Sequence, residues 1–184
     1  MLKKPPLIID NCVLGNLHSA KGLYLLDLLY PGEIIIPSQV LEEATLKSGL
    51  FQELKLLKER EVFQIYTIDD ISEMRRFAKL ERRFKDNGEA QAKGEAAVLT
   101  IAEITKGTVC SDNISDVKPY IDRHKMELKT TLGILFDAYF QKIIDQRQGE
   151  KMIKNIIKDG NKIPVNTFKD VINWFENEEG RELF

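Results

Sequence analysis

Acidic residues stand near short apolar segments, or near the start of a predicted helix, at several places in the 184-residue chain. The acids in question are Asp10, Glu43, Glu95, Asp112 and Asp116. Carboxylates that gather within a few ångströms repel one another, and a hard divalent cation relieves that repulsion. Such a cation lowers the pKa of bound water and neutralises charge on a phosphoryl oxygen. The acids therefore indicate metal-dependent phosphoryl chemistry, provided that the fold brings them together.

The scarcity of nitrogen and sulfur ligands limits which metal these acids can hold. The chain has two histidines, His18 and His124, and two cysteines, Cys12 and Cys110. A site built from oxygen ligands favours Mg²⁺ or Mn²⁺ over zinc. The cysteines lack the paired spacing of a zinc knuckle or a disulfide framework, so we predict that both are small packing residues.

Strand-like and helix-like segments alternate along the chain. Short branched runs predict buried strands at residues 7–9, 34–36 and 108–110, with further strands at 62–67 and 126–128. Apolar spacing predicts helices at about 15–29, from Ser38, and at 50–60, 69–84, 94–105, 116–124, 131–144, 149–158 and 167–177. This alternation predicts a three-layer α/β sandwich with a mostly parallel central sheet, plus C-terminal helices. In such sheets the ligand binds beyond the carboxyl ends of the strands, which is where we expect the acids to converge.

The length and composition predict one main domain. We assign residues 1–145 to the α/β domain and residues 146–184 to a helical extension that packs on its core. No apolar run is long enough to span a membrane, and no secretory signal is visible, so we expect a cytoplasmic protein. The net charge of −2 argues against a general polyanion-binding protein.

One predicted helix carries a basic stripe that could hold a nucleic acid. Arg75, Lys79 and Arg82 share a face at three- and four-residue spacing, with Arg76 and Arg83 beside them. Such a stripe can contact a phosphate backbone. The alternative is a solvated face whose cations pair with glutamates of the same helix.

Five motifs, taken in order, give the chain a resemblance to a known family. They are IIDN with Asp10, PSQVLEEA with Glu43, KGEAAVLTIA with Glu95, VCSDNISD with Asp112 to Asp116, and TTLGILFDA with Thr131. Together they cover roughly residues 7–140, and in this order the sequence resembles a PIN domain, close to the VapC-type toxin ribonucleases.

The resemblance implies a set of site residues. Asp10, Glu43 and Glu95 would be direct or water-mediated ligands of Mg²⁺ or Mn²⁺. Asp116 is the favoured fourth acid and Asp112 its alternative, and Glu42 replaces Glu43 if the register slips by one residue. Ser111 and Thr131 would bind a phosphate or orient an acid, and Asn113 would contact phosphate or RNA.

The function that the resemblance implies is an endoribonuclease in which a metal-activated water cleaves the phosphodiester bond, leaving a 5′-phosphate and a 3′-hydroxyl. The resemblance also suggests a toxin with a small antitoxin partner. A homodimer is a separate expectation. One alternative is a catalytically silent PIN-like binding module. Another is a phosphatase on a related α/β frame, but a haloacid-dehalogenase phosphatase needs a second aspartate where this chain has Cys12.

Overall fold

A five-stranded sheet forms the centre of the computed structural model, which describes residues 5–46, 48–86 and 92–177. The strands are β1 (Leu7–Ile9), β2 (Ile34–Pro37), β3 (Gln64–Tyr66), β4 (Thr108–Cys110) and β5 (Leu128–Lys129). They pair in the order β3-β2-β1-β4-β5, and every pairing is parallel. Because parallel neighbours need crossover connections, at least one helix lies between each strand and the next along the chain.

The three central strands are short and buried on both faces. Ile8 and Ile9 of β1 and Val109 of β4 have no exposed surface, which explains why these strands read as continuous apolar runs. Gly107 lets β4 start beside β1, since a Cβ at this position would lie 2.7 Å from the Pro6 carbonyl oxygen. The apolar runs therefore mark where the strands end, and the polar residues that follow them lie at the carboxyl edge of the sheet.

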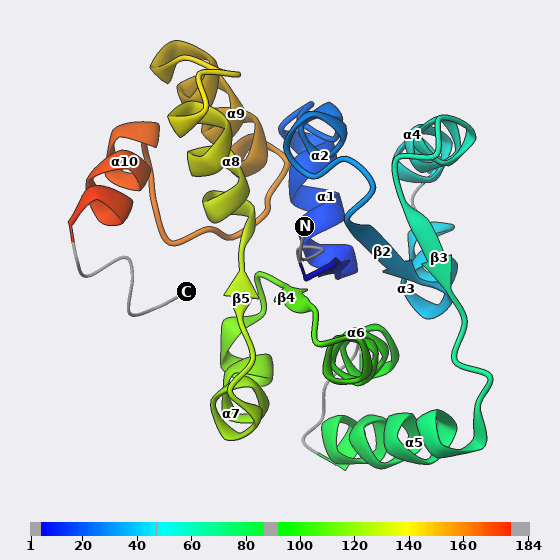
Figure 1. Ribbon diagram of the computed structural model, residues 1–184. Helices are drawn as coiled ribbons and strands as arrows, with labels where there is room; N and C mark the ends of the chain where they lie inside the picture. The colour runs from blue at the N-terminus through cyan, green and yellow to red at the C-terminus, as the bar shows by residue number, and fades with distance from the viewer. Residues whose placement is uncertain (1–4, 47, 87–91, 178–184) are drawn as a thin grey trace.

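Helices cover both faces of the sheet (Figure 1). They are α1 (Asn11–Ser19), α2 (Tyr24–Leu29), α3 (Ser38–Ala44), α4 (Ser48–Glu59), α5 (Ile71–Asp86), α6 (Ala92–Thr105), α7 (Ile114–His124), α8 (Thr131–Phe140), α9 (Gln146–Lys158) and α10 (Phe168–Glu176). Helix α6 packs against β1, β2 and β4, and α5 packs on the outer side of α6. On the other side, α1, α8 and α9 contact one another. This arrangement confirms the predicted three-layer α/β sandwich.

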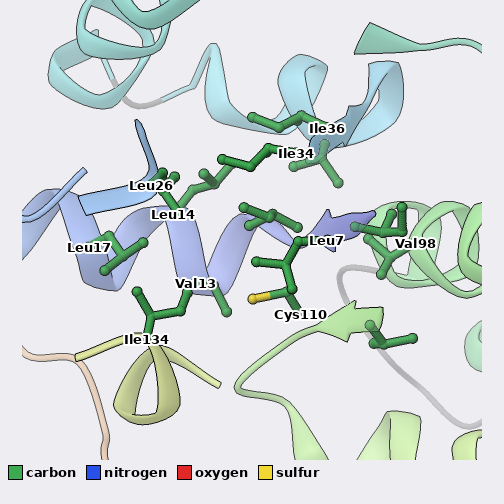
Figure 2. Packing of buried hydrophobic residues seen from close by; sticks show 14 of the residues in the cluster. Leu7, Val13, Leu14, Leu17, Leu26, Ile34, Ile36, Val98, Cys110 and Ile134 are labelled. Carbon is green, nitrogen blue, oxygen red and sulfur yellow. The ribbon is translucent and has the colours of Figure 1, made fainter. Parts of the chain in front are cut away.

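The core is one continuous apolar cluster that includes residues from both sides of the sheet (Figure 2). The C-terminal helices contribute to it through Ile153 and Ile156 of α9 and Phe168 of α10. Helix α9 contacts α1 and α8, and α10 contacts α8. These helices therefore pack on the sandwich, while the boundary that we drew at residue 145 stays a prediction.

The predicted helix at residues 15–29 is wrong in one respect, because the chain forms two helices there. Lys21 has a φ of 56° and ends α1, and the Gly22 amide donates to the Leu17 carbonyl over 2.8 Å. A left-handed residue after the last turn is a common helix stop, although glycine or asparagine usually occupies it. None of the helices in the described ranges is long and apolar enough to cross a bilayer.

Candidate active site

The residues after β1, β4 and β5 meet at one edge of the sheet. The Asp10 amide donates to the Cys110 carbonyl over 2.9 Å, and the Ser111 amide donates to the Lys129 carbonyl over 3.0 Å. These bonds extend the strand pairing by one residue past the strands. The first bond brings together residues that are a hundred positions apart in the chain.

Asp10 is buried at this edge and is the N-cap of α1. Its Oδ1 accepts the Asn11 amide over 2.7 Å. Its Oδ2 accepts the Cys12 thiol over 3.0 Å and the Ser111 hydroxyl over 3.1 Å. Because each carboxylate oxygen accepts about two hydrogen bonds, the described donors fill Oδ2 and leave one position on Oδ1 for another group.

Asp112 lies next to Asp10 and is held by three donors. Its Oδ1 accepts the Thr131 amide over 2.8 Å. Its Oδ2 accepts the Thr131 hydroxyl and the Asn16 side-chain amide, the latter over 2.7 Å. Asp112 therefore resembles Asp10. Its Oδ2 accepts two hydrogen bonds from the described residues, and its Oδ1 accepts one and can accept another.

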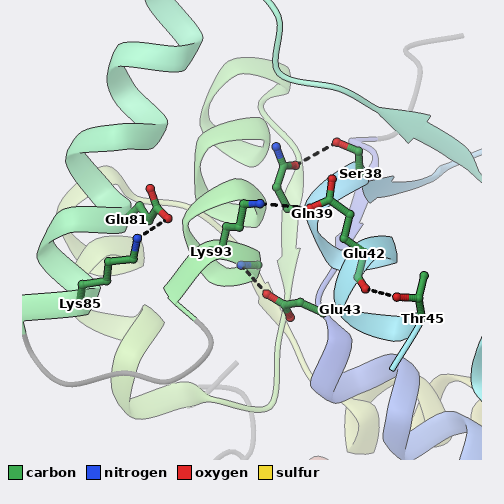
Figure 3. A network of polar contacts seen from close by, with 9 residues as sticks. Ser38, Gln39, Glu42, Glu43, Thr45, Glu81, Lys85 and Lys93 are labelled. Carbon is green, nitrogen blue, oxygen red and sulfur yellow. Dashed lines mark hydrogen bonds and ion pairs between the residues drawn. The ribbon is translucent and has the colours of Figure 1, made fainter. Parts of the chain in front are cut away.

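Glu43 and Glu95 approach the same edge from α3 and α6. The Gly94 amide at the start of α6 donates to Glu43 Oε1 over 2.9 Å, and Figure 3 shows the Glu43 side chain pointing to this helix end. Glu43 Oε2 is buried and accepts no hydrogen bond from the described residues. Glu95 is buried with 2% of its surface exposed, and its Oε1 accepts the side-chain amide of Asn113. The backbone amide of Asn113 donates to the Ser111 hydroxyl over 3.2 Å, and that hydroxyl donates to Asp10, so Asn113 and Ser111 link Glu95 to Asp10.

The two remaining candidate acids have other surroundings. Glu42 is exposed and pairs with Lys93 over 3.1 Å, on the outer side of the α3–α6 contact (Figure 3). Asp116 lies in the first turn of α7, where its Oδ1 accepts the Ser115 hydroxyl over 3.0 Å. Of the alternatives that the sequence left open, Asp112 is the one that accepts hydrogen bonds from the predicted site residue Thr131, and Glu43 is the one that accepts the amide of Gly94, next to Glu95. The choice of ligands, including a role for Asp116, stays a prediction.

The polar residues predicted for the site hydrogen-bond to its acids. Ser111 and Thr131 have no exposed surface, and their hydroxyls donate to Asp10 and Asp112 respectively. Asn113 donates to Glu95. For Ser111 and Thr131 these contacts agree with an orienting role, while a phosphate contact by any of the three residues stays a prediction.

Burial and mutual repulsion act on the acids together. Burial is the main cause that raises the pKa of the Asp10, Asp112 and Glu43 carboxyls. The Asp112 carboxylate raises the pKa of Asp10 further, and the Asp10 carboxylate raises that of Glu43. Hydrogen bonds to the charged forms lower these pKa values and oppose the effect only in part. Asp10 therefore interacts electrostatically with an acid on each side.

The donor set fits a hard cation, although no ready-made cage is present. Within residues 5–46, 48–86 and 92–177, no three His, Cys, Asp or Glu side chains form a metal-binding group. Mg²⁺ keeps several of its waters and commonly takes only one or two protein carboxylates. Mg²⁺ prefers carboxylate oxygens, and three are available here among the described residues. They are Oδ1 of Asp10, Oδ1 of Asp112 and Oε2 of Glu43.

The basic residues of α5 divide into paired and unpaired sets. Arg76 pairs with Glu103 of α6, and Lys85 pairs with Glu81 over 2.7 Å. The predicted stripe of Arg75, Lys79 and Arg82 is exposed, and none of the three has an acidic partner within 4.0 Å among the described residues. Pairing with a glutamate of the same helix thus describes Lys85, whereas a nucleic-acid contact by the stripe stays a prediction.

Two residues of the site were not predicted. Asn16 fixes Asp112, and Cys12 contacts Asp10 although we expected it to serve only for packing. Asn16 lies six residues after Asp10, which places it about one and a half helical turns into α1. A buried amide at this spacing after a strand-end acid is the one signal that could have indicated it.

Residues 6–177 match the sequence model of a protein family that is described as a PIN domain. The match spans most of the chain and confirms the resemblance that the acidic motifs predicted. No curated protein matches the chain.

Proposed function

This chain belongs to the PIN-domain family, whose members are generally nucleases, and from that premise we propose that it is a metal-dependent endoribonuclease. The observation that carries the proposal is the group of carboxylates at the edge of the sheet. Asp10, Asp112 and Glu43 are buried or half-buried, their pKa values are raised, and each keeps an oxygen position that the described donors leave open. A divalent cation is the partner that removes this repulsion.

In this proposal Asp10, Glu43, Asp112 and Glu95 hold Mg²⁺ or Mn²⁺, with Asp116 as a further candidate. The bound cation would supply a water of lowered pKa and neutralise charge on the scissile phosphate. The residues that hydrogen-bond to the acids would hold them in place. Ser111 and Thr131 orient Asp10 and Asp112, while the Gly94 amide orients Glu43. No side-chain nucleophile is required.

We assign the exposed face of α5 to the substrate. Arg75, Lys79 and Arg82 lie along about two turns of helix, and their charges are not neutralised by nearby acids in the described part of the chain. Helix α5 packs on α6, and Glu95 lies in the first turn of α6. A phosphate backbone held along α5 would bind in a salt-dependent way.

The central experiment incubates the purified chain with labelled RNA or labelled single-stranded DNA, in Mn²⁺, in Mg²⁺ or in chelator. We expect RNA cleavage that needs a divalent cation. The adjacent glutamates of α3 give a matched pair of variants: Glu43→Gln should abolish cleavage, and Glu42→Gln should leave it unchanged. Cleavage that continues in chelator, or a Glu43→Gln variant that cuts as fast as the wild type, would overturn the proposal.

The substrate face is tested separately, by binding and not by cleavage. Asp10→Asn is used as the starting variant so that the RNA is not cleaved. Arg75, Lys79 and Arg82 are then changed together to glutamine, and RNA affinity is measured across a range of salt concentrations. Because each lost phosphate contact reduces the slope of log affinity against log salt by about 0.7 for a single strand, we expect a slope lower by about two. A matched control changes three exposed lysines of α9, Lys151, Lys154 and Lys158. Equal slopes for the two triple variants would exclude α5 as the contact.

The toxin role and the small antitoxin partner extend the proposal and rest on the resemblance, and a homodimer and a cytoplasmic location are kept as further proposals. Inducible expression of the wild type should arrest growth, and expression of Asp10→Asn should not. A small protein that binds the wild type and restores growth would be the antitoxin. Harmless accumulation of enzyme that is active when purified would exclude a toxin.

A further inference from the structure

Cys12 lies between the two strand ends that carry Asp10 and Asp112. Its Sγ is 3.0 Å from Asp10 Oδ2 and 3.2 Å from the Asp112 amide nitrogen, and 3.6 Å from the Ser111 hydroxyl oxygen. The side chain is partly exposed, whereas Cys110, one residue before Ser111, has no exposed surface. Among the described residues the thiol of Cys110 makes no hydrogen bond, so the two cysteines differ in their surroundings.

The direction of the hydrogen bonds follows from the chemistry of the partners. A carboxylate offers no proton, so the thiol donates to Asp10. The backbone amide of Asp112 can only donate, so the sulfur of Cys12 accepts from it. One thiol thereby joins the side chain of the acid after β1 to the backbone that carries the acid after β4.

This connection also selects which oxygen of Asp10 is available. Cys12 and Ser111 together fill Oδ2, so the position that remains lies on Oδ1. Without the thiol, Oδ2 would regain a position, and the Asp112 amide would lose its acceptor. The carboxylate could then rotate, and its distance from Asp112 would no longer be fixed.

We propose that Cys12 is a positioning residue that holds the Asp10 and Asp112 carboxylates in the arrangement needed to bind a divalent cation. The inference rests on the proposed function, because it assigns Cys12 a task toward the same cation. Residues that orient metal ligands through hydrogen bonds commonly change metal affinity or activity by about 10- to 100-fold when they are replaced.

The test measures Mn²⁺ binding to the full chain by calorimetry, without nucleic acid, alongside the unfolding midpoint in urea. Cys12→Val removes the donor and the acceptor at similar volume, and Cys12→Ala removes them with the volume. We expect both to bind Mn²⁺ at least about 10-fold more weakly. Cys12→Ser, which keeps a donor and an acceptor, should bind nearly as well as the wild type. Cys110→Ala is the matched control, which should lose stability and keep its Mn²⁺ affinity.

The possible failures can be told apart. If the wild type binds Mn²⁺ and Cys12→Val binds it equally well, the role of Cys12 is refuted while the proposed function stands. If Cys12→Ser is as weak as Cys12→Val, hydrogen bonding is not the cause and the inference is likewise overturned. If the wild type itself binds no Mn²⁺, the proposed function fails and the role of Cys12 fails with it. In cleavage assays, a positioning role predicts a lower kcat with an unchanged KM for RNA.

Discussion

Replacing Gly94 with alanine should separate the position of the Glu43 carboxylate from the stability of the fold. A Cβ at Gly94 would lie 2.9 Å from both carboxylate oxygens of Glu43 and 3.1 Å from its Cδ. Because ordinary contacts of carbon lie at about 3.5 Å or more, the carboxylate has to retreat by roughly half an ångström. The Gly94 amide that now donates to Glu43 would lose its acceptor at the present distance.

Two effects of the substitution on stability oppose each other. Alanine is favoured over glycine within a helix by about 1 kcal/mol. The lost hydrogen bond to a charged group costs about 1.5–3 kcal/mol if it is not replaced. Glu43 is only half-buried and its side chain is flexible, so water can replace part of that bond. We therefore expect the free energy of unfolding to change by no more than about 1–2 kcal/mol.

The effect on activity should be larger than the effect on stability. A displacement of about 1 Å at a reacting centre can reduce the rate about 100-fold, so half that displacement should reduce it by about 10-fold. The assay compares initial rates of RNA cleavage in Mn²⁺ with urea unfolding of the same preparations. Gly133→Ala is the matched control, since its Cβ would lie 3.5 Å from Lys129 and 3.7 Å from Phe175, which are ordinary contacts.

The control should gain up to about 1 kcal/mol and keep full activity. Wild-type rates for Gly94→Ala would refute the argument that Glu43 has to stay at this distance from α6. A loss of stability well above the expected range would show instead that the Glu43 contact is structural.

Three further predictions follow from the described geometry. Because the raised pKa of Asp10 means that the folded chain holds a proton which the unfolded chain has released, metal-free protein should lose unfolding free energy as the pH rises from about 4 toward neutrality. Asp10→Asn should show a shallower pH dependence in urea unfolding with chelator present, and no cleavage; a slope equal to that of the wild type would contradict this. Gly149→Ala places a Cβ 2.4 to 2.5 Å from three ring carbons of Phe168 and should lower the free energy of unfolding by about 2 kcal/mol, so an unchanged thermal midpoint would contradict the tight packing of α10 on α9. Lys125→Gly removes a left-handed non-glycine residue at the end of α7, where φ is 52°, and should raise the free energy of unfolding by about 1 kcal/mol, with no gain counting against backbone strain there.

The sequence predicted where the acids would stand because strand ends are local features. A buried strand needs an apolar run, and the run at residues 7–9 ends at Asp10 as the run at 108–110 ends shortly before Asp112. Parallel pairing then brings those ends to the same edge of the sheet. The edge could thus be predicted without knowing a single side-chain contact.

The hydrogen-bond partners of the acids could not be predicted in the same way. Asn16 reaches Asp112 only because α1 leaves the sheet at a certain angle, and Cys12 reaches the Asp112 amide only because β1 and β4 pair in one register. Spacing along a helix does not contain these angles. For the same reason, the choice between Glu42 and Glu43 depended on the approach of α6, which the sequence of α3 does not determine.

The helix break at Lys21 was missed because it lacks the usual residue. Glycine or asparagine is the ordinary marker of a left-handed helix end, and here the glycine comes one residue later. Apolar spacing continued through the break and suggested one helix.

The pairing of β1 with β4 has a consequence for the synthesis of the chain. Leu7 pairs with Thr108, so the strand made first waits for about a hundred residues before its neighbour on that side has left the ribosome. Until then β1 can pair only with β2, and its other edge stays open to solvent or to a chaperone. Such distant pairing slows folding, since a long loop must close before the contact forms. A nascent or truncated chain that stops before Asp112 would therefore carry Asp10 without its neighbouring acid, and the proposed active site could assemble only after β4 has been made.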